Sequence, residues 1–119
     1  MSRSGLEVLR HILDESDYLL VSSSGLGREE FLRDETRKRA FVRSLEIIGE
    51  ATKNVPPDIR EASPAVEWKA MAGMRDRLIH HYFGVDYELV WDVIVHKIPG
   101  LREQILEILR AEKDREERS

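Results

Sequence analysis

The residues best suited to chemistry lie together in one short segment of the sequence. It contains Arg75 and Arg77, the adjacent pair His80 and His81, and Tyr82. Histidine exchanges a proton near neutral pH, and arginine binds a phosphate through paired hydrogen bonds and stabilises charge that develops on it. These residue types suit metal-free cleavage of RNA, in which a base removes the proton from a 2′-hydroxyl and that oxygen attacks the adjacent phosphorus. The alternative is structural, because a histidine or arginine on a helix most often lies on a solvated face or in the core.

Helical geometry limits which of these side chains can reach one phosphate. Arg75 and Tyr82 are seven residues apart and share a face, whereas His80 lies about 140° around an ideal helix from Arg75. Either the helix unwinds near its end, or a second copy of the chain completes the site across a two-fold axis. We favour the second arrangement, a homodimer with a shared cleft. Arg77 and His81, spaced i,i+4, are the rival pair, and otherwise accessory contacts to RNA or phosphate.

No metal site or other cofactor is predicted. The chain contains no Cys, which excludes disulfides, thiolate catalysis and Cys-ligated metals. On a helix His80 and His81 would point about 100° apart, an arrangement that rarely binds one ion. Asp92 and His96, spaced i,i+4, form at best a weak pair of ligands.

The composition predicts a soluble, cytoplasmic protein of one domain without a membrane partner. The 119 residues are 35% charged and 41% hydrophobic, which is typical of a globular protein. No apolar stretch approaches the roughly 20 residues that span a bilayer, and the N-terminus lacks the apolar core of a signal peptide. The net charge of −4 is unlike that of a general nucleic-acid binder, so a role on RNA requires a local basic patch.

Apolar periodicity predicts a single all-α domain over residues 1–119, most simply an antiparallel bundle of about five helices. No segment alternates with the period of two that a strand requires. Helices are expected from about Leu6 to Val21, Arg28 to Asn54, Pro64 to His81, Asp86 to Ile98 and Pro99 to Glu112, followed by a frayed tail over 112–119. Asp86 is the expected N-cap of the fourth helix.

A second charged segment runs from Arg28 to Arg43 and contains six basic and four acidic residues. It could form a track for an RNA backbone or an exposed helix face with ion pairs one turn apart. We favour the ion-paired face. Trp68 and Trp91 lie among apolar neighbours, which favours packing in the core over base stacking.

The pattern Arg75-x4-His80-x-Tyr82 resembles the Arg-x4–6-His-x-Tyr signature of HEPN-domain ribonucleases, specifically the HepT toxin family. The residues around it, over 71–91, also resemble that family, as do the segment 41–51 and the Pro99-x-Leu101 start of the last helix. The likeness therefore covers nearly the whole chain. It implies a HEPN-like helical bundle that forms a homodimer, with the motifs of both subunits lining one cleft.

The resemblance also implies a function, the toxic component of a type VII toxin–antitoxin system. Such a toxin is a metal-independent RNase, with tRNA as a target class, and here Arg75 and His80 would be its catalytic residues. Its partner would be an MntA-like nucleotidyltransferase antitoxin that transfers AMP from ATP to Tyr82. The added phosphate and base would neutralise the cationic site and occupy the space of an RNA phosphate. The alternative is a non-catalytic, nucleotide-binding partner module of a nucleotidyltransferase.

Overall fold

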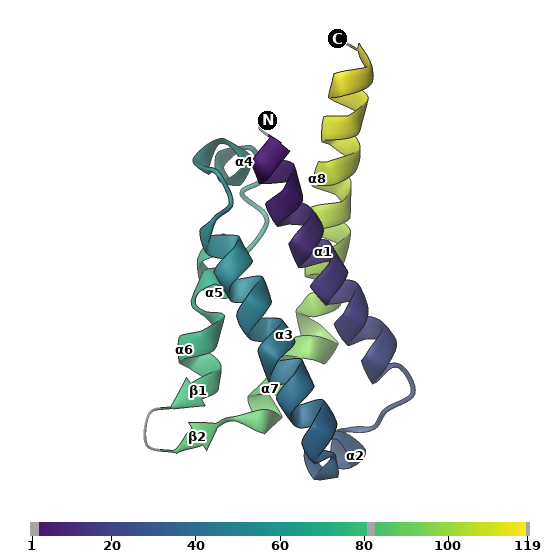
Figure 1. The fold of residues 1–119 in the computed structure, drawn as a ribbon, viewed down its shortest axis with the longest axis vertical. Coiled ribbons are helices and arrows are strands. Elements are labelled where there is room, and N and C mark those ends of the chain that lie inside the picture. The colour runs from purple at the N-terminus through teal and green to yellow at the C-terminus, as the bar shows by residue number, and fades with distance from the viewer. Residues whose placement is uncertain (1–2, 81–82, 119) are drawn as a thin grey trace.

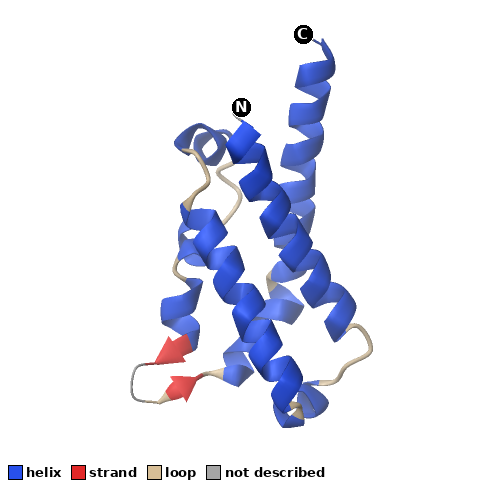
Figure 2. Cartoon of the chain, viewed as in Figure 1, coloured by secondary structure: helices blue, strands red, loops and turns tan. Residues whose placement is uncertain are grey.

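The computed structural model describes residues 3–80 and 83–118, which form helices and one small antiparallel sheet (Figure 1, Figure 2). In chain order the elements are α1 (Arg3–Ser23), α2 (Arg28–Arg33), α3 (Glu35–Lys53), α4 (Pro57–Ala62), α5 (Trp68–Ala72), α6 (Met74–Leu78), β1 (Ile79–His80), β2 (Gly84–Val85), α7 (Tyr87–His96) and α8 (Ile98–Arg118). The predicted all-α class is therefore confirmed. None of the helices in this described part is long and apolar enough to cross a membrane.

The long helices α1, α3 and α8 form the body of the fold. α1 packs against both α3 and α8 and runs antiparallel to each of them (Figure 1). α5 and α6 pack against α3 on the side away from α1, and α7 connects the two-stranded hairpin to α8. The molecule is elongated, with extents of 51 × 31 × 21 Å.

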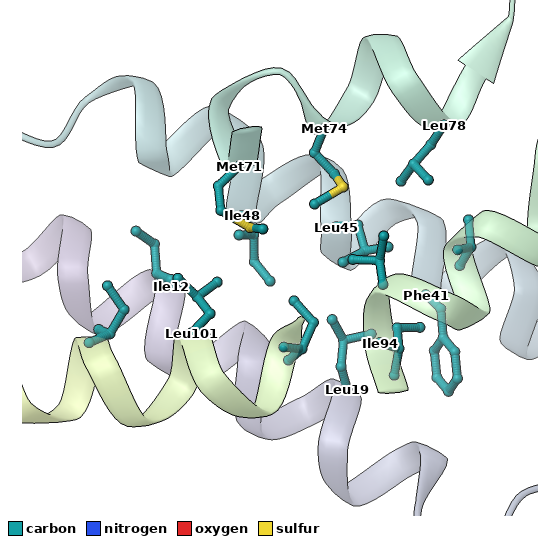
Figure 3. Close-up of a cluster of buried hydrophobic side chains, with 14 of the residues drawn as sticks. Ile12, Leu19, Phe41, Leu45, Ile48, Met71, Met74, Leu78, Ile94 and Leu101 are labelled. Atoms are coloured by element: carbon teal, nitrogen blue, oxygen red, sulfur yellow. The ribbon is translucent and has the colours of Figure 1, made fainter. Parts of the chain in front are cut away.

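The core gathers apolar side chains from all of the longer helices and from the short α5 and α6. Figure 3 shows ten of them directed toward one another: Ile12, Leu19, Phe41, Leu45, Ile48, Met71, Met74, Leu78, Ile94 and Leu101. Trp68 is buried, with its indole N–H donating to the Ser63 carbonyl at 2.9 Å. Trp91 stacks on Phe31 with ring centroids 5.3 Å apart. Both tryptophans therefore pack as predicted.

The single helix predicted from Arg28 to Asn54 is wrong, because the chain breaks into α2 and α3 at Asp34. This residue is extended, with φ −96° and ψ 95°, and its carboxylate accepts a hydrogen bond from the Arg37 amide at 3.0 Å. Asp34 thereby caps α3, since its side chain satisfies an N–H that lacks a partner within the helix. α3 ends at Lys53, shortly before the two prolines predicted to stop it.

The helix predicted from Pro64 to His81 is wrong at its start and in its continuity. Pro64 lies in the turn between α4 and α5. α4 begins instead at Pro57, a position where the missing N–H of proline costs nothing. Gly73 separates α5 from α6, and α6 ends at Leu78. His81 lies outside the described residues.

The last two helices largely follow the expectation. Asp86 caps α7 as predicted, because its Oδ1 accepts a hydrogen bond from the Leu89 amide at 3.0 Å. α8 begins at Ile98 and continues to Arg118. It thus extends through most of the tail that we expected to fray after Glu112.

Candidate functional site

The Arg-x4-His motif begins on α6 and continues into the hairpin formed by β1 and β2. Ile79 follows α6 with φ −114° and ψ 113°, so the helix stops there. Ile79 pairs with Val85 and His80 with Gly84, and the Asp86 amide donates to the Leu78 carbonyl at 2.8 Å. Gly84 has φ +77°, a conformation that favours glycine. Of the two arrangements left open by the spacing, the structure shows the one that we did not favour: the helix unwinds, since Arg75 is helical and His80 is on a strand. The homodimer stays a prediction.

Buried side chains fix this segment to the bundle. Met71, Met74 and Leu78 are at most 3% exposed, and Figure 3 shows them directed toward Leu45 and Ile48 of α3. The approach to α3 is close at Gly49, where a Cβ atom would lie 3.2 Å from the Met71 carbonyl oxygen. A five-residue helix is not stable alone, so these contacts hold α6 and its exposed side chains in place. We define the motif edge as α6, β1 and β2.

Arg75 stands on the exposed side of the motif edge, beside an acidic residue of α3. Its side chain is 57% exposed, and its Nε lies 3.7 Å from Oε2 of Glu46, which is only 21% exposed. Asp76 is a second, exposed neighbour, 3.9 Å from Nη1. Both contacts are long, and exposed pairs of this kind are weak. Glu46 lies on the Nε side of the guanidinium, and Arg75 stays accessible to an incoming phosphate.

His80 is exposed on β1, and its backbone pairs with Gly84. Its imidazole is therefore accessible to a ligand, while the hairpin fixes the position of its backbone. Arg77 is exposed on α6 and has no acidic partner within ion-pair distance among residues 3–80 and 83–118. His81 and Tyr82, the other two residues that the sequence singled out, lie outside the described residues.

Glu46 is a site residue that the sequence reasoning did not single out. It lies in α3 between Leu45 and Gly49, which are buried. A charged residue at the border of an apolar helical face was the available signal. That signal does not say which cation the carboxylate would meet, because α6 is almost 30 residues away in the chain.

The charged segment from Arg28 to Arg43 is largely ion-paired, as predicted. Arg37 lies 2.6 Å from Asp34, and Lys38 lies 3.1 Å from Glu35. Arg28 reaches Glu88 of α7 at 3.5 Å. The backbone hydrogen bond from Arg37, followed by its guanidinium, lowers the pKa of Asp34 below the ordinary value of 3.8.

The part of the chain that the structure describes contains no group of three or more His, Asp or Glu side chains placed to hold a metal ion. A groove of about 600 Å³ lies between α1 and α3, away from the motif edge, with His11 and Arg43 among its lining residues.

The family model described as "Ribonuclease HepT-like" matches residues 8–108, which span every element from α1 to α8 and include the motif edge. The chain belongs to the HepT-like ribonuclease family. This membership confirms the resemblance carried by the motif and its flanks, and it supports ribonuclease activity.

Three relatives illustrate how closely this HepT-like chain matches other proteins. One from Caldanaerobacter subterraneus subsp. tengcongensis, named a "putative RNase", is 52% identical over 105 residues, or 88% of this chain and 94% of the relative. A "putative RNase" of Methanocaldococcus jannaschii is 41% identical over 93% of this chain and 92% of its own length. A "probable ribonuclease HepT" of Thermococcus cleftensis is 40% identical over 86% of this chain and 93% of its own length. No solved structure matches the chain.

Proposed function

We propose that this HepT-like chain is a metal-independent RNase whose catalytic residues are Arg75 and His80. The observation that carries the proposal is the end of α6 at Leu78, which leaves both residues exposed on consecutive elements of the motif edge. Histidine provides proton transfer and arginine provides charge stabilisation. Family membership supports RNA as the substrate.

Two proton transfers are needed, and a homodimer would supply two histidines for them. His80 of one subunit accepts the proton of a ribose 2′-hydroxyl, and the 2′-oxygen attacks the phosphorus. The 5′-oxygen of the next nucleotide leaves and takes a proton from the second copy of His80. Arg75 binds the non-bridging oxygens, where negative charge grows during the attack. The product carries a 2′,3′-cyclic phosphate, so the step consumes no water and no cofactor.

Cleavage of total tRNA in EDTA tests this assignment. The unmodified protein, checked by intact mass, is compared with His80→Ala and Arg75→Ala, and with Arg10→Ala and His11→Ala as matched controls on the exposed face of α1. We expect losses of at least about 100-fold for the first two variants and wild-type rates for the controls. Wild-type cleavage by folded His80→Ala would remove that residue from the mechanism. An inactive, dimeric and unmodified wild type would favour the nucleotide-binding module instead.

We also propose that the RNase is a toxin acting on tRNA and neutralised by AMPylation of Tyr82. Tyr82 lies two residues after His80 in the sequence, so a phosphate attached to its oxygen would compete with RNA for the cations of the motif edge. A nucleotidyltransferase antitoxin encoded by a neighbouring gene, given ATP, should add whole AMP units to the wild type and none to Tyr82→Phe. Intact mass measures the addition, and addition to Tyr82→Phe at the wild-type level would contradict the assignment.

A further inference from the structure

Three charged residues of α3 are spaced so that they follow one line along the helix beside the motif edge. Arg39, Glu46 and Lys53 are each separated by seven residues, which is two helical turns and about 10 Å. The middle residue, Glu46, contacts Arg75. One cation therefore stands on α3 on either side of Arg75, and the three positive charges extend over about 20 Å.

The two outer cations are available to bind a ligand. Arg39 and Lys53 are both exposed, and neither forms an ion pair within the described ranges 3–80 and 83–118. Their neighbours differ in this respect. Arg37 is paired with Asp34, and Lys38 is paired with Glu35 and lies 4.4 Å from the Tyr87 ring centroid. Arg43 faces Glu50 at 3.8 Å, so this pair adds little net charge to the surface.

The tertiary contacts place these two cations at opposite ends of the motif edge. Lys38, adjacent to Arg39, reaches the ring of Tyr87, which follows β2 by two residues. The first turns of α3 therefore lie beside the strand end of the motif edge. Lys53 lies one turn beyond Gly49, where α3 meets α5 and the start of α6.

We propose that Arg39 and Lys53 bind phosphates on the two sides of the scissile phosphate, so that single-stranded RNA runs along α3 past Arg75. This inference rests on the RNase function proposed above and adds the path of its substrate. A stacked strand advances about 3.4 Å along its axis per nucleotide, so a step of about 10 Å along α3 matches an advance of about three nucleotides. Isolated exposed cations in a row also explain how a chain with net charge −4 can attract a polyanion locally.

We call Arg39, Arg75 and Lys53 together the row. The salt dependence of RNA binding tests directly whether the row contacts RNA. A fluorescent 12-nucleotide single-stranded RNA is titrated with the His80→Ala protein in EDTA, and its Kd is measured by anisotropy at several salt concentrations. Arg39→Ala and Lys53→Ala are each added to this background. The controls are Arg33→Ala on α2, another exposed arginine, and Lys113→Ala near the end of α8. We expect each test variant to weaken binding about 3- to 10-fold at low salt and to lower the slope of log K against log salt by about 0.7.

Once the parent protein is shown to bind RNA, two results of this assay would overturn the row. One is an unchanged slope in both test variants, with circular dichroism equal to that of the parent protein. The other is an equal drop in slope for Arg33→Ala or Lys113→Ala, which would indicate diffuse attraction rather than contacts at these two residues. Absence of any RNA binding by the parent protein would also reject it.

Substrate length separates this inference from the proposed function. In the active protein, Arg39→Ala should raise KM for a 12-nucleotide RNA more than for a dinucleotide. Only the longer substrate extends from Arg75 as far as Arg39 and Lys53. Wild-type cleavage with an unchanged ratio of the two KM values would leave the RNase function standing and reject the row. RNA binding that depends on Arg39 and Lys53, without cleavage by the wild type, would support the row and reject the RNase function.

Discussion

The bundle and the motif edge use buried side chains for different purposes. In the bundle, buried residues of α1, α3 and α8 meet one another and leave mostly charged residues outside. In the motif edge, buried Met74 and Leu78 alternate with exposed Arg75, Arg77 and His80 within a few residues. The contrast shows how a short helix with little stability of its own can present polar chemistry. Its apolar residues fasten it to α3, and the remaining positions are left free for ligands.

The largest effect is expected from breaking the bundle at Phe41. This side chain is fully buried and stacks on Phe31 with centroids 5.3 Å apart. Phe41→Ala should lower the free energy of unfolding by about 3–5 kcal/mol, measured by urea denaturation. Val21→Ala is the control, since Val21 is 75% exposed on α1, and should stay within about 0.5 kcal/mol of wild type. A loss below about 1 kcal/mol for Phe41→Ala would mean that the bundle repacks easily.

A smaller effect is expected where the bundle meets the motif edge, at Gly49. An added Cβ would lie 3.2 Å from the Met71 carbonyl oxygen and would push α5 away from α3. Gly49→Ala should lower the free energy of unfolding by about 1–2 kcal/mol, despite the better helix propensity of alanine. Gly100→Ala is the matched control, because nothing lies within 4 Å of its added Cβ. Equal unfolding midpoints for the two variants would show that the close approach is not required.

A change within the motif edge itself should reduce activity while leaving the bundle intact. Glu46→Gln removes the anion that lies beside Arg75. If this anion orients the guanidinium, kcat for RNA cleavage should fall about tenfold. KM and the unfolding midpoint should change little. Glu50→Gln, one turn further along α3 and paired with Arg43, should keep the wild-type kcat. Glu46→Asp should restore part of the rate, and a kcat for Glu46→Gln equal to the wild-type value would exclude a positioning role.

The smallest effect is expected at the break between α2 and α3. Because the pKa of Asp34 is lowered below its ordinary value of 3.8, its stabilising contribution is complete above that pH. It is lost as the pH falls through the lowered pKa of the folded state. The urea midpoint of wild type should therefore drop between pH 5 and pH 3 by more than that of Asp34→Asn, whose amide still caps the helix. Identical drops in the two proteins would contradict this account.

The sequence predicted the long helices well and the chain breaks less well. Apolar spacing located α1 and α8, and Asp86 was correctly identified as the cap of α7. Asp34 has the same capping chemistry, but it stands within a run of charged helix formers whose propensity indicates a continuous helix. The break between α5 and α6 falls at Gly73, a residue of poor helix propensity. The early end of α6 coincides with the pairing of Ile79 with Val85, which helical spacing does not indicate. The pairs of Arg37 with Asp34 and of Lys38 with Glu35 could be predicted because each pair is three residues apart, whereas the contact of Arg28 with Glu88 of α7 could not.

The candidate site divides in the same way. Arg75, His80 and Tyr82 were singled out by residue type and spacing, and the motif with its flanks indicated the family that the chain belongs to. Their catalytic and modification roles stay predictions. Glu46 and Lys53 were not singled out, and Arg39 was counted only within the charged segment. Arg39, Glu46 and Lys53 became candidates because they lie on α3 beside Arg75 in the structure. The sequence could not show this, since Arg75 is distant from them in the chain.

The sequence by itself determined the helical class, the family and the chemistry of the motif, because these follow from residue types and from spacings of a few residues. Only the tertiary structure decided that His80 leaves the helix and that Glu46 faces Arg75. The pairing of Ile79 with Val85 and the bond from the Asp86 amide to Leu78 stabilise an extended backbone where helical spacing predicts another turn. The packing of Met74 and Leu78 against α3 then sets which acidic side chain lies beside the motif arginine. These contacts join residues from different elements, so no periodicity along the chain could reveal them.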